Sequence, residues 1–234
     1  MMARDRIIDI SVAISPSLPV WPGDPQITIE LSSSIEQGAP ANVSRLHIGT
    51  HTGTHLDAPW HFIPSGDRED QLPLDALIGP CWVCDLTQLD HQIDAGDLEA
   101  AKIPDGTRRL LLKTRNSDLW TAQPDTFDQD FIALMPGAAR YVVDHGIRLV
   151  GIDYPSIEPF DSQNGETHHV LLGAGVIPVE TLDLRGASEG AYTLLCLPLK
   201  IAGVDGAPCR AVLLSPETTE YRGALEVECR DADP

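Results

Sequence analysis

The chain has 234 residues, 42% of them hydrophobic, and a formal net charge of −19. This length accommodates one large domain or two small ones with a sizeable core. The acidic balance argues against nucleic acid or an anionic membrane surface as a partner. The sequence contains no apolar run of about 18 residues, so we expect no membrane span.

Regular strand-like runs dominate the chain from its N-terminus onward. The first residues lead directly into such a run without a secretory hydrophobic region, so we expect a cytoplasmic location.

Runs rich in β-branched and apolar residues, bounded by Gly and Pro, predict strands over Arg6–Ile14, Gln26–Ser32, Val43–His51, Cys81–Leu86, Arg109–Lys113, Leu149–Asp153, Val176–Thr181, Thr193–Leu197 and Ala211–Leu214.

Helical signals are fewer and fall mostly between the later strands. Asp94 is a predicted N-cap for a helix over Ala95–Lys102, Pro136 begins one that ends at His145, and a short helix covers Glu166–Leu172. No linker divides the chain. We therefore expect one domain over residues 1–234, of mixed α/β class with a β-rich core. Residues from about 216 to 234 form a charged C-terminal extension with a possible strand at Ala224–Cys229.

The five cysteines do not predict a disulfide framework, because their number is odd and the expected location is reducing. Cys81 and Cys84 form a C-x-x-C pair. Within a strand this spacing sends the two side chains to opposite faces, so we assign them no metal or redox role.

The segment His51–Phe62 concentrates the chemistry of the chain, with three histidines and one aspartate (His51, His55, Asp57 and His61) spaced four, two and four residues apart. Imidazole and carboxylate are the ligands that zinc prefers. A straight strand would separate His51 from His55 by about 13 Å, too far to share one ion. We therefore predict a strand ending near His51, followed by a loop that Gly53 and Pro59 bend around a cation.

Further donors lie downstream. Thr167-His168-His169 opens a short apolar helix, in which adjacent residues point about 100° apart, so only one histidine of the pair is expected to face the site. Glu180 lies in an apolar, strand-like run, where a buried carboxylate requires a cation or strong hydrogen bonds. These donors would suit a second metal ion. His47 and His145 are assigned structural roles.

The His51–Phe62 segment resembles the signature of the cyclase-like metal-dependent hydrolase family, of which bacterial kynurenine formamidases are members. The resemblance extends over most of the chain. It includes Trp21-Pro22-Gly23-Asp24-Pro25, Gly151-Ile152-Asp153 with Ser156-Ile157, His168-His169, Glu180, and Asp205-Gly206-Ala207-Pro208-Cys209-Arg210.

This resemblance implies a swivelling β/β/α fold, a homodimer and a centre of two divalent metal ions, with zinc expected and manganese as the rival. It implies that His51, His55 and Asp57 bind the first metal, and that Asp57 bridges to a second metal held by His168 and Glu180. His61 is then the proton shuttle, and Trp21 a substrate contact.

Three functions remain open from the sequence. The favoured one is an arylformamidase of tryptophan catabolism that hydrolyses N-formyl-L-kynurenine to L-kynurenine and formate, with hydroxide supplied at neutral pH by a metal that lowers the pKa of bound water to about 7. The second is opening of a cyclic amide or lactone, as isatin hydrolase does. The third is a non-catalytic protein that binds metal or a small molecule. Trp60 either contributes with Trp21 to an apolar substrate wall or packs in the core beside Phe62.

Overall fold

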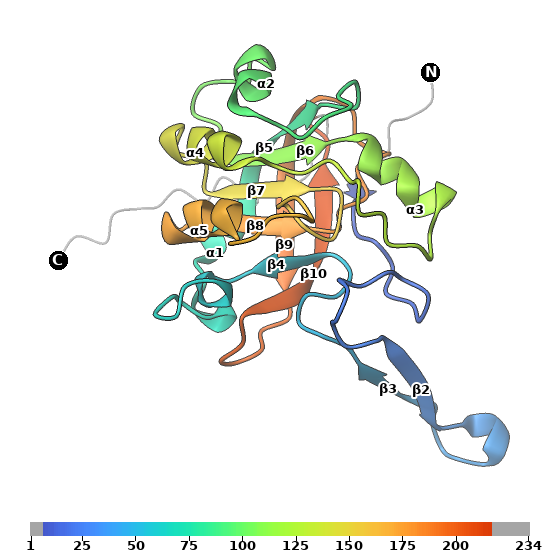
Figure 1. The fold of residues 1–234 in the computed structure, drawn as a ribbon. Helices are drawn as coiled ribbons and strands as arrows, with labels where there is room; N and C mark the ends of the chain where they lie inside the picture. Colours follow the sequence, from blue (N-terminus) through green and yellow to red (C-terminus); the bar gives the residue numbers. More distant parts are fainter. Residues whose placement is uncertain (1–6, 217–234) are drawn as a thin grey trace.

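The fold is organised around a closed ring of strands. The computed structural model describes residues 7–216. The large sheet has eight strands in the order β1-β10-β4-β8-β7-β6-β5-β9, and a further β9–β10 pairing closes it into a barrel that leaves β1 outside (Figure 1). These strands are β1 (Ile7–Asp9), β4 (His55–Asp57), β5 (Ile78–Asp85), β6 (Arg109–Lys113), β7 (Leu149–Ile152), β8 (Ile177–Glu180), β9 (Gly190–Pro198) and β10 (Gly206–Leu214).

Strands β5, β6, β7 and β8 run parallel to one another, whereas the pairs β4–β8, β4–β10, β9–β10 and β5–β9 are antiparallel. The parallel strands are covered on the outside by helices α2 (Ala95–Ala100), α4 (Pro136–Asp144) and α5 (Glu166–Gly173), as Figure 1 shows. The remaining helical segments of the described residues are short: α1 (Leu74–Leu77), α3 (Leu119–Ala122) and the 3₁₀ turns Ile35–Gln37, Pro59–His61, Glu69–Gln71 and Arg115–Asp118.

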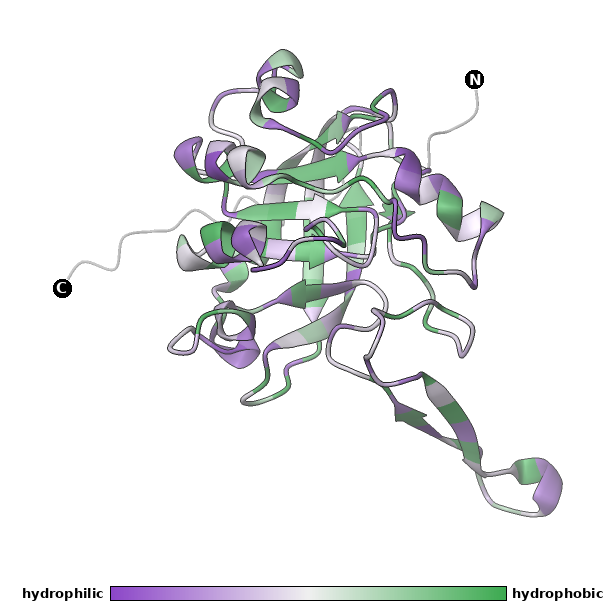
Figure 2. Ribbon diagram, viewed as in Figure 1, coloured by the Kyte–Doolittle hydropathy of each residue, from purple (hydrophilic) through white to green (hydrophobic). Residues whose placement is uncertain are grey.

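The layers enclose one hydrophobic core inside the barrel and another between the barrel and the helices, and β6 contributes side chains to both. Leu111 belongs to the cluster inside the barrel, while Leu110 and Leu112 belong to the cluster under the helices. A strand buried on both faces reads as a continuous apolar run rather than an alternating one. Figure 2 shows the same arrangement, with hydrophobic strands at the centre and hydrophilic residues concentrated on the outer helices.

A two-stranded hairpin, β2 (Thr28–Ser33) and β3 (Val43–His47), projects away from the barrel (Figure 1). Almost every residue of both strands is exposed. The base of this hairpin leads into the segment that carries His51, so the hairpin and the site are adjacent along the chain.

The mixed α/β fold with a β-rich core is confirmed, and so are the three predicted helices within two residues of their bounds. Asp94 caps α2 by accepting a hydrogen bond of 3.0 Å from the Asp97 backbone N–H. Cys81 and Cys84 lie in the two different cores, as their spacing predicted. Within the described residues, no helix is long and apolar enough to cross a membrane.

Several predicted strand bounds are wrong. The strand expected over Arg6–Ile14 ends at Asp9, and other strands differ where Pro or Gly lies inside them. β9 and β10 both begin earlier than predicted, and β10 contains Pro208, a residue type that usually marks the end or edge of a strand. The helices α1 and α3, of four residues each, were not predicted. The expected strand Ala224–Cys229 lies outside the described residues, as does the C-terminal extension beyond residue 216.

Candidate metal centre

The histidine-rich segment bends twice, but it does not form the continuous loop predicted from the sequence. Strand β3 ends at His47 rather than near His51, and a turn then leads into the short strand β4. Gly53 supplies the bend with φ +66, and a Cβ at this position would lie 2.6 Å from the Ile14 side chain. The correction is that His55 and Asp57 lie on a strand, which sends both side chains to the same face.

Strand pairing brings Glu180 to this face. In the antiparallel pair of β4 and β8, His55 lies directly opposite Glu180. Nε2 of His55 is 3.3 Å from Oε2 of Glu180 and 3.6 Å from Oδ1 of Asp57. All three side chains are buried. The register of two short strands therefore assembles one imidazole and two carboxylates.

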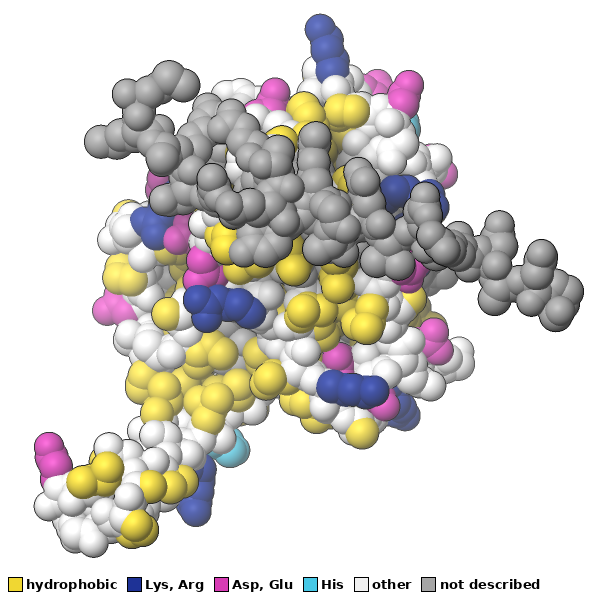
Figure 3. Space-filling view, turned by 180° about the vertical axis from the view of Figure 1, so that it is seen from behind, with side chains coloured by type: hydrophobic (Ala, Val, Ile, Leu, Met, Phe, Trp, Pro, Cys, Tyr) yellow, Lys and Arg dark blue, Asp and Glu magenta, His cyan; other side chains and the backbone are white. Residues whose placement is uncertain are grey.

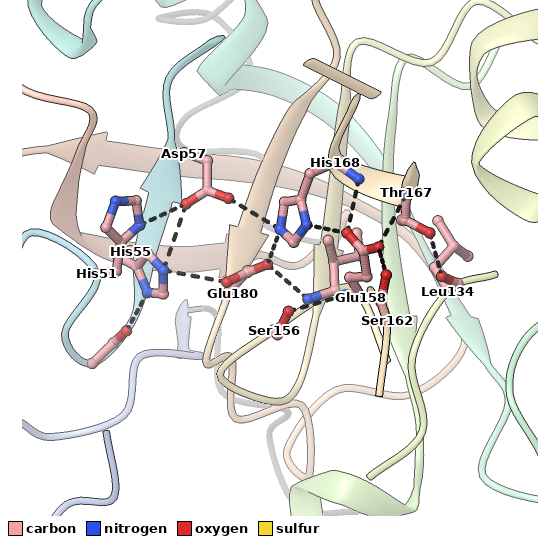
Figure 4. A network of polar contacts seen from close by, with 12 residues as sticks. His51, His55, Asp57, Leu134, Ser156, Glu158, Ser162, Thr167, His168 and Glu180 are labelled. Carbon is pink, nitrogen blue, oxygen red and sulfur yellow. Dashed lines mark hydrogen bonds and ion pairs between the residues drawn. The ribbon is translucent and has the colours of Figure 1, made fainter. Parts of the chain in front are cut away.

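Helix α5 adds the fourth group from the other side. His168 is buried, and its Nε2 lies 3.3 Å from Oε1 of Glu180 and 3.6 Å from Oδ2 of Asp57 (Figure 4). The ring of Phe62 stacks on His168 with ring centroids 4.3 Å apart. His169 is exposed on the helix surface. Only one histidine of the pair faces the cluster, as the helical geometry predicted.

His51 approaches Asp57 from the turn before β4. Its Nδ1 lies 2.9 Å from Oδ1 of Asp57, and its Nε2 lies 3.3 Å from Oδ2 of Asp205. Gly206 permits this approach, because a Cβ at that position would lie 2.7 Å from Cε1 of His51 and 2.6 Å from the carbonyl oxygen of Leu56. Asp57 thus stands between His51 and His55 on one side and His168 on the other.

Electrostatics of the metal-free cluster favour imidazolium–carboxylate pairs. Burial by itself would lower the pKa of His51, but the carboxylates of Asp205 and Asp57 outweigh it and raise the pKa to about 10. Burial also opposes the charged form of His168, yet Glu158 and Glu180 raise its pKa to about 10. Burial would raise the pKa of Asp57, but the surrounding imidazoles, His51 above all, hold it well below its usual range.

Several possible metal-ligand atoms in this cluster lie near charged groups but make no hydrogen bond. Nε2 of His51, Nε2 of His55 and Oδ2 of Asp57 are buried and make no hydrogen bond within the part of the chain that the structure describes. Nδ1 of His55 lies 2.8 Å from the carbonyl oxygen of Gly53. Because a carbonyl only accepts, Nδ1 carries the proton and the lone pair of Nε2 faces the cluster. Buried nitrogen and oxygen atoms that make no hydrogen bond are suited to bind a cation.

Two overlapping groups have donor atoms close enough to hold an ion, each within 4.8 Å of one another: His51 with Asp57 and His61, and His55 with Asp57 and Glu180. Asp57 belongs to both, which fits a bridging carboxylate. The first group includes His61, so the geometry allows this residue to act as a ligand as well as the shuttle that the resemblance implied.

The cluster opens into a cavity of about 480 Å³. Trp21 lines it and packs against Phe127 and Phe160, with ring centroids 5.5 and 5.2 Å apart. His61 also lines it, with about 30% of its side chain exposed. Trp60 is not among the lining residues. Its ring is covered by the guanidinium of Arg68 at 3.5 Å, so this geometry does not support the predicted substrate contact of Trp60.

The family follows from comparison with known proteins. The family model described as "Putative cyclase" matches residues 8–159. This chain belongs to the cyclase family. Cyclase-like protein 3 of Arabidopsis thaliana is 38% identical over 216 residues, covering 89% of this chain and 79% of that protein. The kynurenine formamidase of Salinibacter ruber (strain DSM 13855 / M31) is 37% identical over 211 residues, covering 88% of this chain and 96% of that protein.

Solved structures share this cyclase fold. A potential metal-dependent hydrolase with cyclase activity is 36% identical with a TM-score of 0.76, covering 88% of this chain and 96% of that one. An isatin hydrolase bound to the product analogue thioisatinate has a TM-score of 0.78 at 22% identity, covering 90% of this chain and 92% of that one. At that identity the likeness concerns the fold alone.

The sequence reasoning missed two carboxylates of this cyclase-family site. Asp205 contacts His51 and also lies 3.7 Å from Nδ1 of His61, while its Oδ1 accepts a hydrogen bond of 2.9 Å from the hydroxyl of Thr50. Glu158 lies 2.6 Å from Nδ1 of His168. Asp205 stood within a segment that resembles the family, but nothing in its spacing indicated a role. Glu158 gave no signal, because its burial arises only in the folded chain.

Proposed function

We propose that this protein is a metal-dependent amide hydrolase that acts on aryl formamides, with N-formyl-L-kynurenine as substrate and L-kynurenine and formate as products. The observation that carries the proposal is the cluster around Asp57, which opens into an aromatic-walled cavity. The kynurenine formamidase of Salinibacter ruber, 37% identical along most of this chain, supports the same substrate class. That substrate would place the protein in tryptophan catabolism.

The residues present fit two divalent cations. His51, His55 and Asp57 would hold one, while Asp57, His168 and Glu180 would hold the other. The support is the set of orphaned buried atoms on His51, His55 and Asp57, together with a donor set of imidazoles and carboxylates. This set suits zinc, and manganese is the alternative. When bound, such ions activate water as a nucleophile and stabilise negative charge on the carbonyl oxygen.

The chain itself would move the proton. His61 lies at the cavity beside the cluster, with its ring stacked on His51 at a centroid distance of 3.9 Å. Burial lowers the pKa of His61, which keeps the imidazole neutral near pH 7 and ready to accept a proton from water. An aryl amine leaves poorly as an anion, so we assign to His61 the return of that proton to the departing nitrogen.

Substrate positioning falls to the aromatic wall. Trp21, Phe127 and Phe160 form a cluster at the side of the cavity, and Phe62 also lines it. Flat apolar side chains of this kind fit the aryl ring of the proposed substrate. The same wall would accommodate the bicyclic ring of isatin, the substrate class of the cyclic amide alternative.

A substrate panel with zinc-loaded protein tests the proposal. We expect formate release from N-formyl-L-kynurenine with a kcat/KM at least tenfold above that for isatin opening. A preference for isatin would favour the cyclic amide alternative. Stoichiometric metal binding without hydrolysis of any formamide, cyclic amide or lactone would instead show a non-catalytic binding protein.

We also propose that the chain forms a homodimer in which the β2–β3 hairpin contributes to the interface. The hairpin exposes five large apolar side chains, Ile29, Leu31, Ile35, Val43 and Leu46. Figure 3 shows hydrophobic side chains on the hairpin and on the adjoining face of the body. Exposed apolar patches of this kind mark interaction surfaces. Light scattering on the Leu31→Glu/Leu46→Glu variant should report a monomer, whereas Leu74→Glu, at an exposed site on α1, should remain dimeric.

A further inference from the structure

One three-residue segment, Ser156–Glu158, contacts two of the three residues proposed to hold the second cation, His168 and Glu180. The backbone N–H of Ile157 donates a hydrogen bond of 2.7 Å to Oε1 of Glu180. The carboxylate of the next residue, Glu158, accepts from Nδ1 of His168 at 2.6 Å (Figure 4). His168 lies on a helix and Glu180 on a strand, and both form a hydrogen bond with this segment.

Glu158 is itself held in place by several donors. Its Oε1 accepts from the hydroxyl of Ser162 and from the backbone N–H of Thr167, while its Oε2 also accepts from the backbone N–H of His168 at 3.2 Å. The carboxylate is buried, with 4% of the residue exposed. Burying an ionised carboxylate is costly unless such partners compensate it.

The hydrogen bonds to Glu158 fix the state of His168, because Ser162, Thr167 and the His168 backbone N–H all donate to its carboxylate oxygens. A carboxylate can only accept a hydrogen bond, so Nδ1 of His168 must carry a proton. In the neutral imidazole the lone pair is then on Nε2, the atom that faces Asp57 and Glu180. Phe62, stacked on the ring, restricts its rotation.

We propose that Glu158 is a positioning residue, which orients His168 and fixes its tautomer so that Nε2 presents its lone pair for a divalent cation between Asp57, His168 and Glu180. The inference rests on the proposed function of this site. Metal-binding histidines generally donate their second N–H to such a partner, and loss of that partner lowers metal affinity by about 10- to 100-fold.

A purely structural role is the competing explanation. Glu158 accepts from the first-turn N–H groups of α5, so its contribution could be confined to stabilising the start of that helix. The two roles differ in the property that a substitution changes. Helix capping affects the unfolding of metal-free protein, whereas positioning of His168 affects cation affinity in protein that remains folded.

Zinc affinity, measured by competition with a chelating dye, separates these roles without any substrate. Glu158→Gln is nearly isosteric and can donate as well as accept, so it no longer requires a proton on Nδ1. We expect its affinity for the weaker of two zinc ions to fall by about 10- to 100-fold, while circular dichroism still reports a folded protein. The matched control is Glu166→Gln. Glu166 lies in the first turn of α5 near His168, but it is exposed and paired with Arg140 at 3.2 Å, so this variant should bind zinc like the wild type.

Ser162→Ala provides a milder test should Glu158→Gln fail to fold. It removes one donor to Glu158 while leaving the carboxylate in place, and we expect about a fivefold loss of zinc affinity. Wild-type zinc affinity in folded Glu158→Gln, or in Ser162→Ala if the first variant does not fold, would overturn the proposal for Glu158 alone. A wild-type protein that binds no divalent cation would overturn this proposal and the proposed function together.

Discussion

His55 and Glu180 face each other across the antiparallel pair of β4 and β8, with Nε2 of His55 3.3 Å from Oε2 of Glu180. The cluster is therefore built into the register of the barrel. A shift of one residue in either strand would turn its side chain to the opposite face. Strands hold side chains more precisely than loops do, which suits a site that must keep several donors around one ion.

Replacement of His61 should separate the roles of ligand and proton shuttle. We expect His61→Gln to retain its zinc and to lose about 10²- to 10⁴-fold in kcat for the formamide, because a positioned acid–base group contributes that much. Elemental analysis and formate release measure the two properties. The control is His47→Gln on the exposed hairpin. Loss of one zinc from His61→Gln would instead identify His61 as a ligand, and unchanged kcat would exclude the shuttle role.

The stability of metal-free protein should fall as the solution becomes alkaline. The pKa values of His51 and His168 are both raised to about 10 in the folded chain, from about 6.5 when unfolded. Their contribution to the free energy of unfolding is complete below pH 6.5 and is lost as pH rises toward 10. Chelator-treated protein should thus show a lower urea midpoint at pH 9.5 than at pH 6.

Zinc should reduce this pH dependence, since the cation replaces the protons on the imidazoles and its affinity increases with pH. The comparison is the urea midpoint of zinc-loaded protein at the same two pH values. Metal-free protein that is equally stable, or more stable, at pH 9.5 would contradict the assigned imidazolium–carboxylate pairs.

The two tryptophans proposed from the sequence should behave differently. Trp21 lines the cavity, so Trp21→Ala should raise KM for the aryl formamide about tenfold through lost aromatic contact. Trp60 does not line the cavity and is covered by Arg68, so Trp60→Ala should leave KM unchanged. It should lower the free energy of unfolding, to which the lost cation–π contact contributes about 0.5–1 kcal/mol. Steady-state kinetics and chemical unfolding measure these effects. An equal rise in KM for both variants would argue against this placement of Trp60.

Gly206 should be intolerant of a side chain. A Cβ there would meet the Leu56 carbonyl oxygen at 2.6 Å and the His51 ring at 2.7 Å. We expect Gly206→Ala to lower the free energy of unfolding by about 1–3 kcal/mol and to weaken zinc binding through displacement of His51. Gly137→Ala is the control, because its Cβ would meet nothing within 4 Å. A neutral Gly206→Ala variant would contradict the close approach.

The first half of the site was predictable because its residues lie close together in the sequence. His51, His55 and Asp57 fall in one short segment, and Gly53 indicated that the chain must bend there. The strand β4 was not predictable, since three residues give no alternating pattern and its register depends on β8 and β10. Local sequence thus indicated the donors, while pairing between distant strands decided their geometry.

Glu158 and Asp205 could not be found in the same way. Glu158 lies in the loop between β7 and α5, and its buried carboxylate contacts His168 of that helix. Asp205 lies just before β10, within hydrogen-bonding distance of the hydroxyl of Thr50, 155 residues away along the chain. Contacts of this kind depend on tertiary structure, so neither the composition nor the spacing of residues predicts them.

Anomalous diffraction from crystals of the zinc-loaded protein tests the central claim most directly. We predict two zinc peaks on either side of Asp57, one contacted by His51 and His55, the other by His168 and Glu180. Absence of zinc from this cluster under saturating metal, or its binding only at other residues, would contradict the account.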